Sequence, residues 1–239
     1  LHQSGVTRVV FSSTAAVYGT PQSVPVRETD PLSCESVYAE TKLMIEKTLG
    51  WYSQTTDMRS VCLRYFNAAG ASDDATLGED WRYSQNLIPH VMKAVLGFAP
   101  ALKVFGNDFP TPDGTGVRDY IHVEDLARAH VAALDYLAKN GESIVCNVGT
   151  GHGTSVMDII ATTERITGKK VPYEIVARRA GDPRVVGPPQ QNQHRPTAQL
   201  PHGRPADCRA GEGPQAARPP RRHADPLGRR IRPHSDGPR

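Results

Sequence analysis

The sequence predicts an α/β protein built on a doubly wound parallel sheet. Segments with strand-like patterns alternate with segments that have helical periodicity, as expected of βαβ units. The chain has 239 residues, enough for one large domain or two small ones. It contains no visible internal repeat. The expected architecture is an incomplete Rossmann-like sheet joined to a smaller α/β substrate-binding domain.

Hydrophobic periodicity and helix start and stop signals place the elements in order. Strands are expected at 6–12, 60–66, 102–105, 144–148 and 171–176. Helices are expected at 37–52, 87–96, 123–138 and from Thr154 or Ser155 to about 166. Glu124 and Asp125 suit the first turn of the third helix, and Gly168 is placed to end the fourth.

Composition excludes several classes of partner. The net charge of +3 is too small to indicate nucleic-acid binding. No apolar run is long enough to span a membrane, and the first residues do not resemble a signal peptide. The four cysteines are widely spaced and form no Cys-x-x-Cys pair, which favours a reducing cytoplasm and argues against a metal knuckle.

Tyr38 and Lys42 are the strongest candidates for catalysis. Their four-residue spacing puts them on one face of the expected helix, one turn apart. An ammonium group favours the ionised form of a nearby phenol, so Tyr38 could act as a base. The alternative is an amphipathic helix with a half-buried tyrosine and a lysine that reaches solvent.

Small hydroxyl residues end the first expected strand. Ser12, Ser13 and Thr14 follow its apolar run. In doubly wound sheets, ligands bind beyond the carboxyl ends of the strands. We therefore expect these hydroxyls to converge with the helix that carries Tyr38, and Thr14 to offer a hydroxyl to the substrate oxygen.

Six stretches, in order, resemble the UDP-glucose 4-epimerase branch of the extended short-chain dehydrogenase/reductase family. They are 11–19, 38–42, 64–67, 85–89, 105–123 and 178–183. The resemblance covers roughly residues 1–186 and implies an NAD cofactor, a UDP-hexose substrate and a homodimer in the intact family member. It also implies the interconversion of UDP-glucose and UDP-galactose through a 4-keto sugar.

The resemblance assigns roles to individual residues. Those expected to be catalytic are Tyr38, Lys42 and Thr14, and those expected to bind the cofactor are Ser12, Ser13, Tyr38, Lys42, Tyr65 and Phe66. Those expected to bind the nucleotide sugar are Thr14, Asn67, Asn86, Leu87, Lys103, Val104, Phe105, Arg118, Arg179 and Asp182.

Several of these residues have simpler interpretations. Asn86 could cap a helix, Phe105 could belong to the core, and Arg118 could pair with Asp113 or Asp119. The run 149–154 resembles a phosphate-binding loop but lacks its Gly-Lys-Ser/Thr ending, so a strand-to-helix turn is favoured. His122, Glu124, Asp125 and His130 form no tight ligand set, and no metal is expected.

The two ends of the chain depart from the family pattern. No glycine-rich phosphate turn precedes Val9, so residues 1–70 are expected to be the C-terminal part of an NAD-binding domain. Residues 71–186 are expected to bind mainly the nucleotide sugar, with some segments returning to the first domain. Residues 187–239 contain no Phe, Tyr, Trp, Val or Lys, which favours a frame-shifted tail over a disordered, basic partner-binding tail.

The residues after Thr14 favour epimerisation over related reactions. Relatives that dehydrate or decarboxylate nucleotide sugars carry an acid here, whereas this chain has Ala15 and Ala16. The alternatives are another nucleotide-sugar epimerase or dehydratase of the same family, and a non-catalytic fragment unable to hold NAD.

Overall fold

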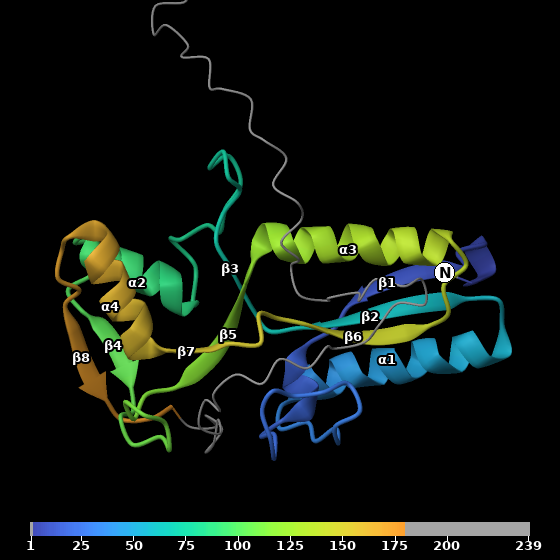
Figure 1. The fold of residues 1–239 in the computed structure, drawn as a ribbon, viewed down its shortest axis with the longest axis horizontal. Helices are drawn as coiled ribbons and strands as arrows, with labels where there is room; N and C mark the ends of the chain where they lie inside the picture. The colour runs from blue at the N-terminus through green and yellow to red at the C-terminus, as the bar shows by residue number, and fades with distance from the viewer. Residues whose placement is uncertain (1, 180–239) are drawn as a thin grey trace, which may run out of the picture.

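The first lobe of the molecule is a parallel sheet between two helices (Figure 1). The structure is a computed structural model that describes residues 2–179. Three strands lie in the order β1–β2–β6, with β1 at Arg8–Ser12, β2 at Arg59–Tyr65 and β6 at Ile144–Val148. All pairs are parallel, with Val10 opposite Val61 and Leu63 opposite Cys146. The carboxyl ends of the three strands therefore meet at one edge.

Helix α1 (Val37–Thr55) covers one face of this sheet and α3 (Val123–Ala138) covers the other (Figure 1). Strand β2 is buried on both faces, as expected for the central strand of a parallel sheet. Val61 and Leu63 pack with Leu137 of α3, whereas Cys62 packs with Leu49 of α1. Burial on both faces holds the two helices in fixed positions over the strand ends.

The second lobe joins a two-stranded parallel sheet to two helices. The strands are β4 (Leu102–Phe105) and β8 (Tyr173–Val176), and the helices are α2 (Leu87–Val95) and α4 (Val156–Thr167). Val91 and Val104 lie in its core with Ile160 of α4. This lobe carries the chain between residues 85 and 109 that the resemblance assigns to the substrate.

Three strands that the sequence analysis did not predict run between the lobes (Figure 1). They are β3 (Asn67–Ala69), β5 (Val117–His122) and β7 (Gly153–Ser155). β3 pairs with β5 in parallel, and β7 pairs with β5 antiparallel. Two of them have only three residues, and β5 is interrupted by charged residues, so none has the alternation that marks a strand.

The other expected elements are confirmed, with small shifts of their ends. Strand β1 starts at Arg8 rather than at residue 6, α1 continues to Thr55, and β8 starts at Tyr173. Short 3-10 helices form at His2–Ser4 (η1) and Ala15–Tyr18 (η2). The fourth helix starts at a capping box of Ser155 and Asp158 and ends at Gly168, whose φ of 67° suits a residue without Cβ.

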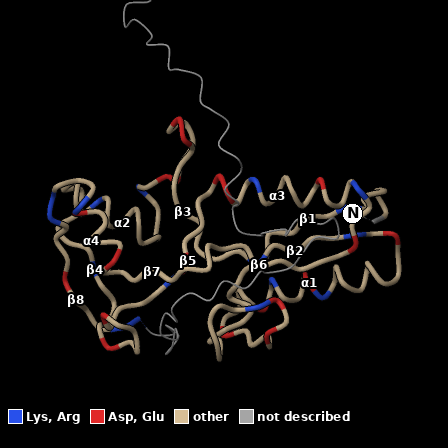
Figure 2. Tube along the Cα trace, viewed as in Figure 1, with Lys and Arg blue, Asp and Glu red and all other residues tan. Residues whose placement is uncertain are grey.

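Positive and negative side chains are interspersed along the described chain (Figure 2). Within residues 2–179, no helix is both long and apolar enough to cross a membrane. Asp182 and the expected tail at 187–239 lie outside the described residues.

Candidate active site

The Tyr38–Lys42 pair lies where α1 meets the carboxyl end of β1. Ser36 caps α1 by accepting a hydrogen bond from Ala39 N at 3.2 Å, so Tyr38 stands in the first turn. Lys42 Nζ donates to the backbone carbonyl of Ser12 at 2.9 Å. It also lies 5.7 Å from the centre of the Tyr38 ring and 5.1 Å from that of Phe11. The ammonium is thus fixed on the strand end, with two of its three N–H donors left for other acceptors.

Two tyrosines face this point and differ in their surroundings. Tyr38 is 52% exposed, whereas Tyr65, at the end of β2, is half-buried. Burial, followed by the nearby Tyr38, raises the pKa of Tyr65, and a hydrogen bond with Ser12 offsets part of this shift. Tyr65 therefore stays a neutral phenol at physiological pH. The accessible phenol is that of Tyr38.

Ser12 also contacts a histidine from the opposite helix. Its hydroxyl lies 2.8 Å from Nε2 of His130, whose Nδ1 lies 2.8 Å from the Leu126 carbonyl. Since a carbonyl only accepts, Nδ1 carries a proton and donates it to Leu126, which leaves Nε2 facing the Ser12 hydroxyl. The His130 and Tyr65 rings are tilted with centroids 6.5 Å apart. His130 thus supports the strand end from the α3 side.

Thr14 and Ser13 have different surroundings. The Thr14 hydroxyl accepts from Ala16 N at 3.2 Å, so its proton is still available for donation to another oxygen. Ser13 is fully buried, and its hydroxyl donates to the Glu46 carboxylate. This hydroxyl therefore faces the protein interior, and the role of Ser13 in binding the cofactor stays a prediction.

Asp119 of β5 binds the loop that follows β6, next to Phe66 at the end of β2. Its carboxylate accepts from Thr150 N at 2.9 Å, from Thr150 Oγ1 at 2.7 Å and from Gly151 N at 2.8 Å. A Cβ on Gly149 would lie 2.6 Å from the Asp119 carboxylate and 2.7 Å from the Phe66 ring. The run 149–154 connects β6 to the short strand β7, which leads directly into α4, so the expected strand-to-helix turn contains a strand. Asp119 holds the start of this run beside Phe66.

Arg118 does not form the ion pair considered as its simpler interpretation. Asp119 binds the loop described above, and Asp113 accepts from Ser155 and Thr115. Within the described chain, the Arg118 guanidinium donates only to the Val117 carbonyl, at 2.8 Å, and takes part in no salt bridge. Its charge is half-buried and available to an anion.

Arg178 and Arg179 are adjacent but differ in what they bind. Arg178 is paired with Asp108 at 2.6 Å and lies 3.9 Å from the Phe109 ring centre. Arg179 lies 3.9 Å from the centre of the Phe105 ring, and no carboxylate in residues 2–179 pairs with it. Burial, then the charges of Lys93 and Arg179, lower the pKa of His90, which keeps that imidazole neutral.

The remaining expected ligands are distributed along the second lobe and β3. Asn86 stands at the start of α2 but makes no side-chain capping bond; its amide donates to Glu79 at 2.7 Å. Leu87 is half-buried, and Asn67 and Lys103 are exposed. Val104 is 1% exposed, so its side chain faces the core, and its role in binding the substrate stays a prediction. Phe105 is half-buried beneath Arg179 rather than in the core.

Sequence reasoning missed four residues that surround this site: Glu46, Arg64, Asp119 and His130. The spacing of Tyr38, Lys42 and Glu46, each four residues apart, is a signal that could have identified Glu46. Arg64 in an otherwise buried strand is a signal for a buried ion pair. Asp119 and His130 have no such local signal, since their partners are distant in sequence.

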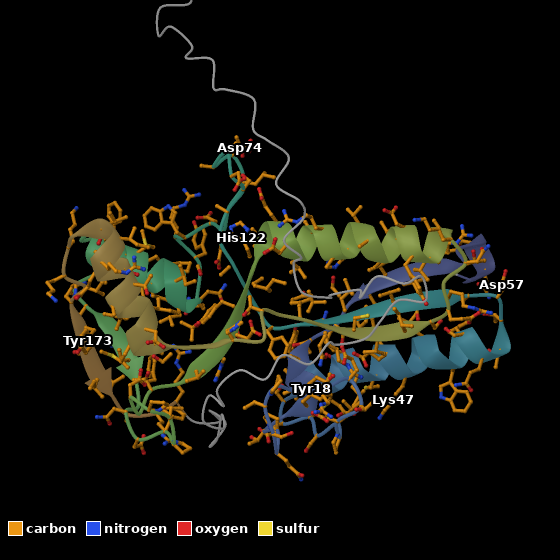
Figure 3. The ribbon with its side chains drawn as sticks, viewed as in Figure 1. Tyr18, Lys47, Asp57, Asp74, His122 and Tyr173 are labelled. Atoms are coloured by element: carbon orange, nitrogen blue, oxygen red, sulfur yellow. The ribbon has the colours of Figure 1, made fainter. Side chains whose placement is uncertain are left out.

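No group of His, Cys, Asp and Glu side chains in residues 2–179 could hold a metal ion. His122 lies where β5 meets α3, and its ring accepts from Glu124 N at 3.3 Å as a helix cap (Figure 3). The side chains at the carboxyl ends of β1 and β2 offer hydroxyls, phenols and an ammonium, whereas the guanidinium groups of Arg118 and Arg179 lie on β5 and over Phe105.

A parallel sheet whose carboxyl edge brings a Tyr–Lys pair on a helix to strand-end hydroxyls defines a dehydrogenase-type α/β protein of the short-chain class. A model described as "NAD dependent epimerase/dehydratase family" matches residues 1–149. The chain belongs to this family.

The most similar proteins include several UDP-glucose 4-epimerases. The chain is 47% identical over 178 residues to that of Halalkalibacterium halodurans, covering 74% of this chain and 53% of that protein. A crystal structure from Stenotrophomonas maltophila with bound NAD and formylated UDP-arabinopyranose has 45% identity and a TM-score of 0.73, over 77% of this chain and 55% of that one. One from Bifidobacterium longum, in complex with NAD+ and UDP, has 43% identity and a TM-score of 0.71, over 76% and 55%. The chain thus spans about half the length of the relatives it matches.

Proposed function

We propose that this chain carries the catalytic edge of an NAD-dependent enzyme that interconverts UDP-glucose and UDP-galactose through a 4-keto intermediate. The observation that carries this proposal is the placement of Lys42 on the Ser12 carbonyl beside the accessible Tyr38. The similarity to UDP-glucose 4-epimerases with bound NAD and UDP-sugars supports it.

The strand ends suit the nicotinamide end of NAD. Ser12, Lys42, Tyr38, Tyr65 and Phe66 lie at the edge where doubly wound sheets bind cofactors. Lys42 has N–H donors left for a ribose, and the Tyr65 and Phe66 rings can form an aromatic wall. Bound NAD would take a hydride from C4 of the sugar and return it to the other face. The chain would orient the sugar and move the proton.

Tyr38 is the proposed base. It would take the proton of the sugar 4-hydroxyl, and the Lys42 ammonium would stabilise the phenolate by its charge. Thr14 would donate a hydrogen bond to the same sugar oxygen, because its hydroxyl proton is still available. Tyr65 would stay neutral, since its raised pKa keeps it protonated. When the 4-keto sugar is reduced, Tyr38 would return the proton.

Arg118 and Arg179 are the proposed ligands of the UDP diphosphate. Guanidinium groups suit bidentate contact with phosphate, and both are without a carboxylate partner in the described chain. The first turn of α2, from Leu87, adds backbone N–H groups that favour an anion, whereas the Asn86 N–H already donates to Ser84 Oγ at 3.0 Å. Asn67, Lys103, Phe105 and the Val104 backbone would contact the rest of the nucleotide sugar, and Asp182 is proposed from the resemblance alone.

The absence of an acid after Thr14 favours epimerisation over dehydration or decarboxylation of the nucleotide sugar. Ala15 and Ala16 open η2 and carry no proton-handling group, so dehydration or decarboxylation would lack its expected acid. Another nucleotide-sugar epimerase of the same family remains the second candidate.

We also propose a homodimer and a cytoplasmic location. Helix α1 exposes Val37, Met44 and Trp51, an apolar surface of the kind that subunit interfaces cover. The cysteines are widely spaced, and no disulfide joins those within residues 2–179, which agrees with a reducing compartment.

Replacing Tyr38 by Phe tests the proposed function. In the NAD-loaded holoenzyme, Tyr38→Phe should lower kcat for UDP-galactose by roughly 10²–10⁴-fold, because the base is lost. UDP affinity should stay unchanged, since the phenol does not bind the nucleotide. Tyr173→Phe, on an exposed strand, is the matched control. Parental turnover in Tyr38→Phe would refute the assignment.

A further inference from the structure

A buried carboxylate lies on the same face of α1 as the Tyr38–Lys42 pair. Glu46 follows Lys42 by one helical turn, as Lys42 follows Tyr38. Exposure falls along this face, from 52% at Tyr38 to a half-buried Lys42 and to 8% at Glu46. This face of the helix thus runs from the site into the core, where its last member, Glu46, is a charged residue.

Arg64 of β2 and Ser13 of β1 bind this carboxylate. Arg64 Nε donates to the two Glu46 oxygens at 3.0 and 3.2 Å, and Nη2 donates at 2.6 Å. The Ser13 hydroxyl donates to the same group. Arg64 is 4% exposed and Ser13 is fully buried. The contacts form a bidentate buried ion pair that joins α1 to two adjacent strands.

The pair continues into a fully hydrogen-bonded network. Arg64 Nη1 donates to the Tyr18 hydroxyl at 2.8 Å, and that hydroxyl donates to Asn147 Oδ1 at 2.7 Å. Asn147 N donates to Glu28 at 2.8 Å, and Asn147 Nδ2 to the Val26 carbonyl at 3.1 Å. Tyr18 lies beside the start of α1 (Figure 3). In the described chain, no buried side-chain nitrogen or oxygen lacks a partner.

The charge states agree with this arrangement. Burial alone would lower the pKa of Arg64, but its hydrogen bonds to Glu46 and Tyr18 outweigh burial and raise the pKa above its usual value. Burial raises the pKa of Tyr18 despite Arg64, so this phenol stays neutral. The guanidinium is therefore charged whenever the chain is folded.

Net stability does not explain such a pair. An apolar pair of similar volume is often as stable or more stable, because two charges must be desolvated. What a bidentate pair adds is direction, since the planar guanidinium and the carboxylate meet in a fixed geometry. Ser13 lies between Ser12, whose carbonyl holds Lys42, and Thr14. A group that fixes Ser13 to α1 therefore fixes both sides of the site.

We propose that Glu46 and Arg64 are positioning residues that set helix α1 against the end of β1, and with it Tyr38 against Thr14. The proposal rests on the proposed function and deepens it. Neither residue touches the reacting atoms. They act indirectly. They fix the position of Ser13 on β1, and they fix the position of α1, which carries Tyr38 and Lys42.

The discriminating variant is Glu46→Leu/Arg64→Met. It removes both charges together, so neither is left buried alone, although the buried Ser13 hydroxyl loses its acceptor. It is expected to fold with a thermal midpoint no more than about 10 °C below the parental one. In the NAD-loaded holoenzyme, kcat should fall on the order of 10–10²-fold, because a misplacement of about 1 Å has such an effect. KM for the UDP-hexose should stay within about two-fold, since the nucleotide ligands lie elsewhere.

Hydrogen exchange on the full chain provides a readout that is independent of turnover. Amides at 40–45 of α1 should exchange about ten-fold faster in the double variant, because the helix has lost its anchor to β1. Glu164→Gln/Lys170→Gln removes an exposed ion pair of 2.7 Å and is the matched control; it should change neither readout.

Parental kcat together with parental exchange in the double variant would overturn the proposal. If the parental holoenzyme does not epimerise UDP-hexoses, the proposed function fails, and the exchange experiment alone decides the positioning role. Should the double variant not fold, the single variant Glu46→Gln replaces it: faster exchange at 40–45 supports the proposal, and parental exchange refutes it.

Discussion

Removing the Arg118 guanidinium should weaken UDP binding without destabilising the fold. Within the described chain, this group donates only to the Val117 carbonyl, at 2.8 Å, and no carboxylate neutralises it. A charge-assisted hydrogen bond contributes roughly 1.5–3 kcal/mol. Arg118→Met, which keeps most of the apolar stem, should therefore weaken UDP binding by about 10–150-fold.

Isothermal titration of the full chain with UDP measures this change. Arg178→Met is the matched control, because its guanidinium is already bound to the carboxylate and carbonyl of Asp108, at 2.6 and 2.5 Å. That variant should bind UDP within about two-fold of the parental chain. Arg179→Met, one residue away and without a carboxylate partner in residues 2–179, should behave like Arg118→Met.

Two results would refute this reasoning. If Arg118→Met binds UDP as the parental chain does, the guanidinium is not a ligand of the diphosphate. If Arg178→Met loses as much affinity as Arg179→Met, the loss comes from a general change of charge rather than from a specific contact. Repeating the titrations at high salt separates these cases, since only the general effect is strongly screened.

Three further predictions concern the proton-transfer pair, a helix start and alkaline pH. Lys42→Met removes the bond to the Ser12 carbonyl and the charge beside Tyr38, so kcat of the holoenzyme should fall by about 10²-fold; unchanged steady-state kinetics would contradict it. Ser155→Ala breaks the capping box of α4 and should lower the free energy of unfolding in urea by about 1 kcal/mol; an unchanged midpoint would exclude the cap as a stabilising contact. Burial raises the pKa of Cys62 to about 12, so its contribution to stability is complete below about pH 9 and is lost as the pH rises toward 12. Between about pH 8 and 10.5, the parental chain should lose roughly 2 kcal/mol more than Cys62→Ala, and equal losses in urea titrations would refute this.

Local patterns in the sequence predicted much of the fold. Strand β4, helix α3 and strand β6 have the bounds that the sequence predicts, because their apolar residues repeat with a clear period and their ends carry caps or turns. The Tyr38–Lys42 pair is equally local, since one helical turn brings the two side chains together whatever the rest of the chain does.

The sequence by itself therefore determined the α/β class and most of the helices and strands, with small shifts of their ends. It also predicted which residues could take part in catalysis. Only the tertiary structure decided which partner each polar group has. It showed that Ser13 and Val104 face the interior, that Asp119 holds Thr150 and that Ser12 contacts His130. Strands β3, β5 and β7 likewise form only because β5 pairs with β3 on one side and with β7 on the other.

The physical reason is the range of the interactions. Helical periodicity and capping act over a few residues, so they can be read from the chain directly. A hydrogen bond such as Ser12–His130 joins groups 118 residues apart, and several polar partners are available to each group until the sheet fixes their positions. The partner is then selected by burial, because a polar group left unpaired in the core costs more free energy than any single alternative contact recovers.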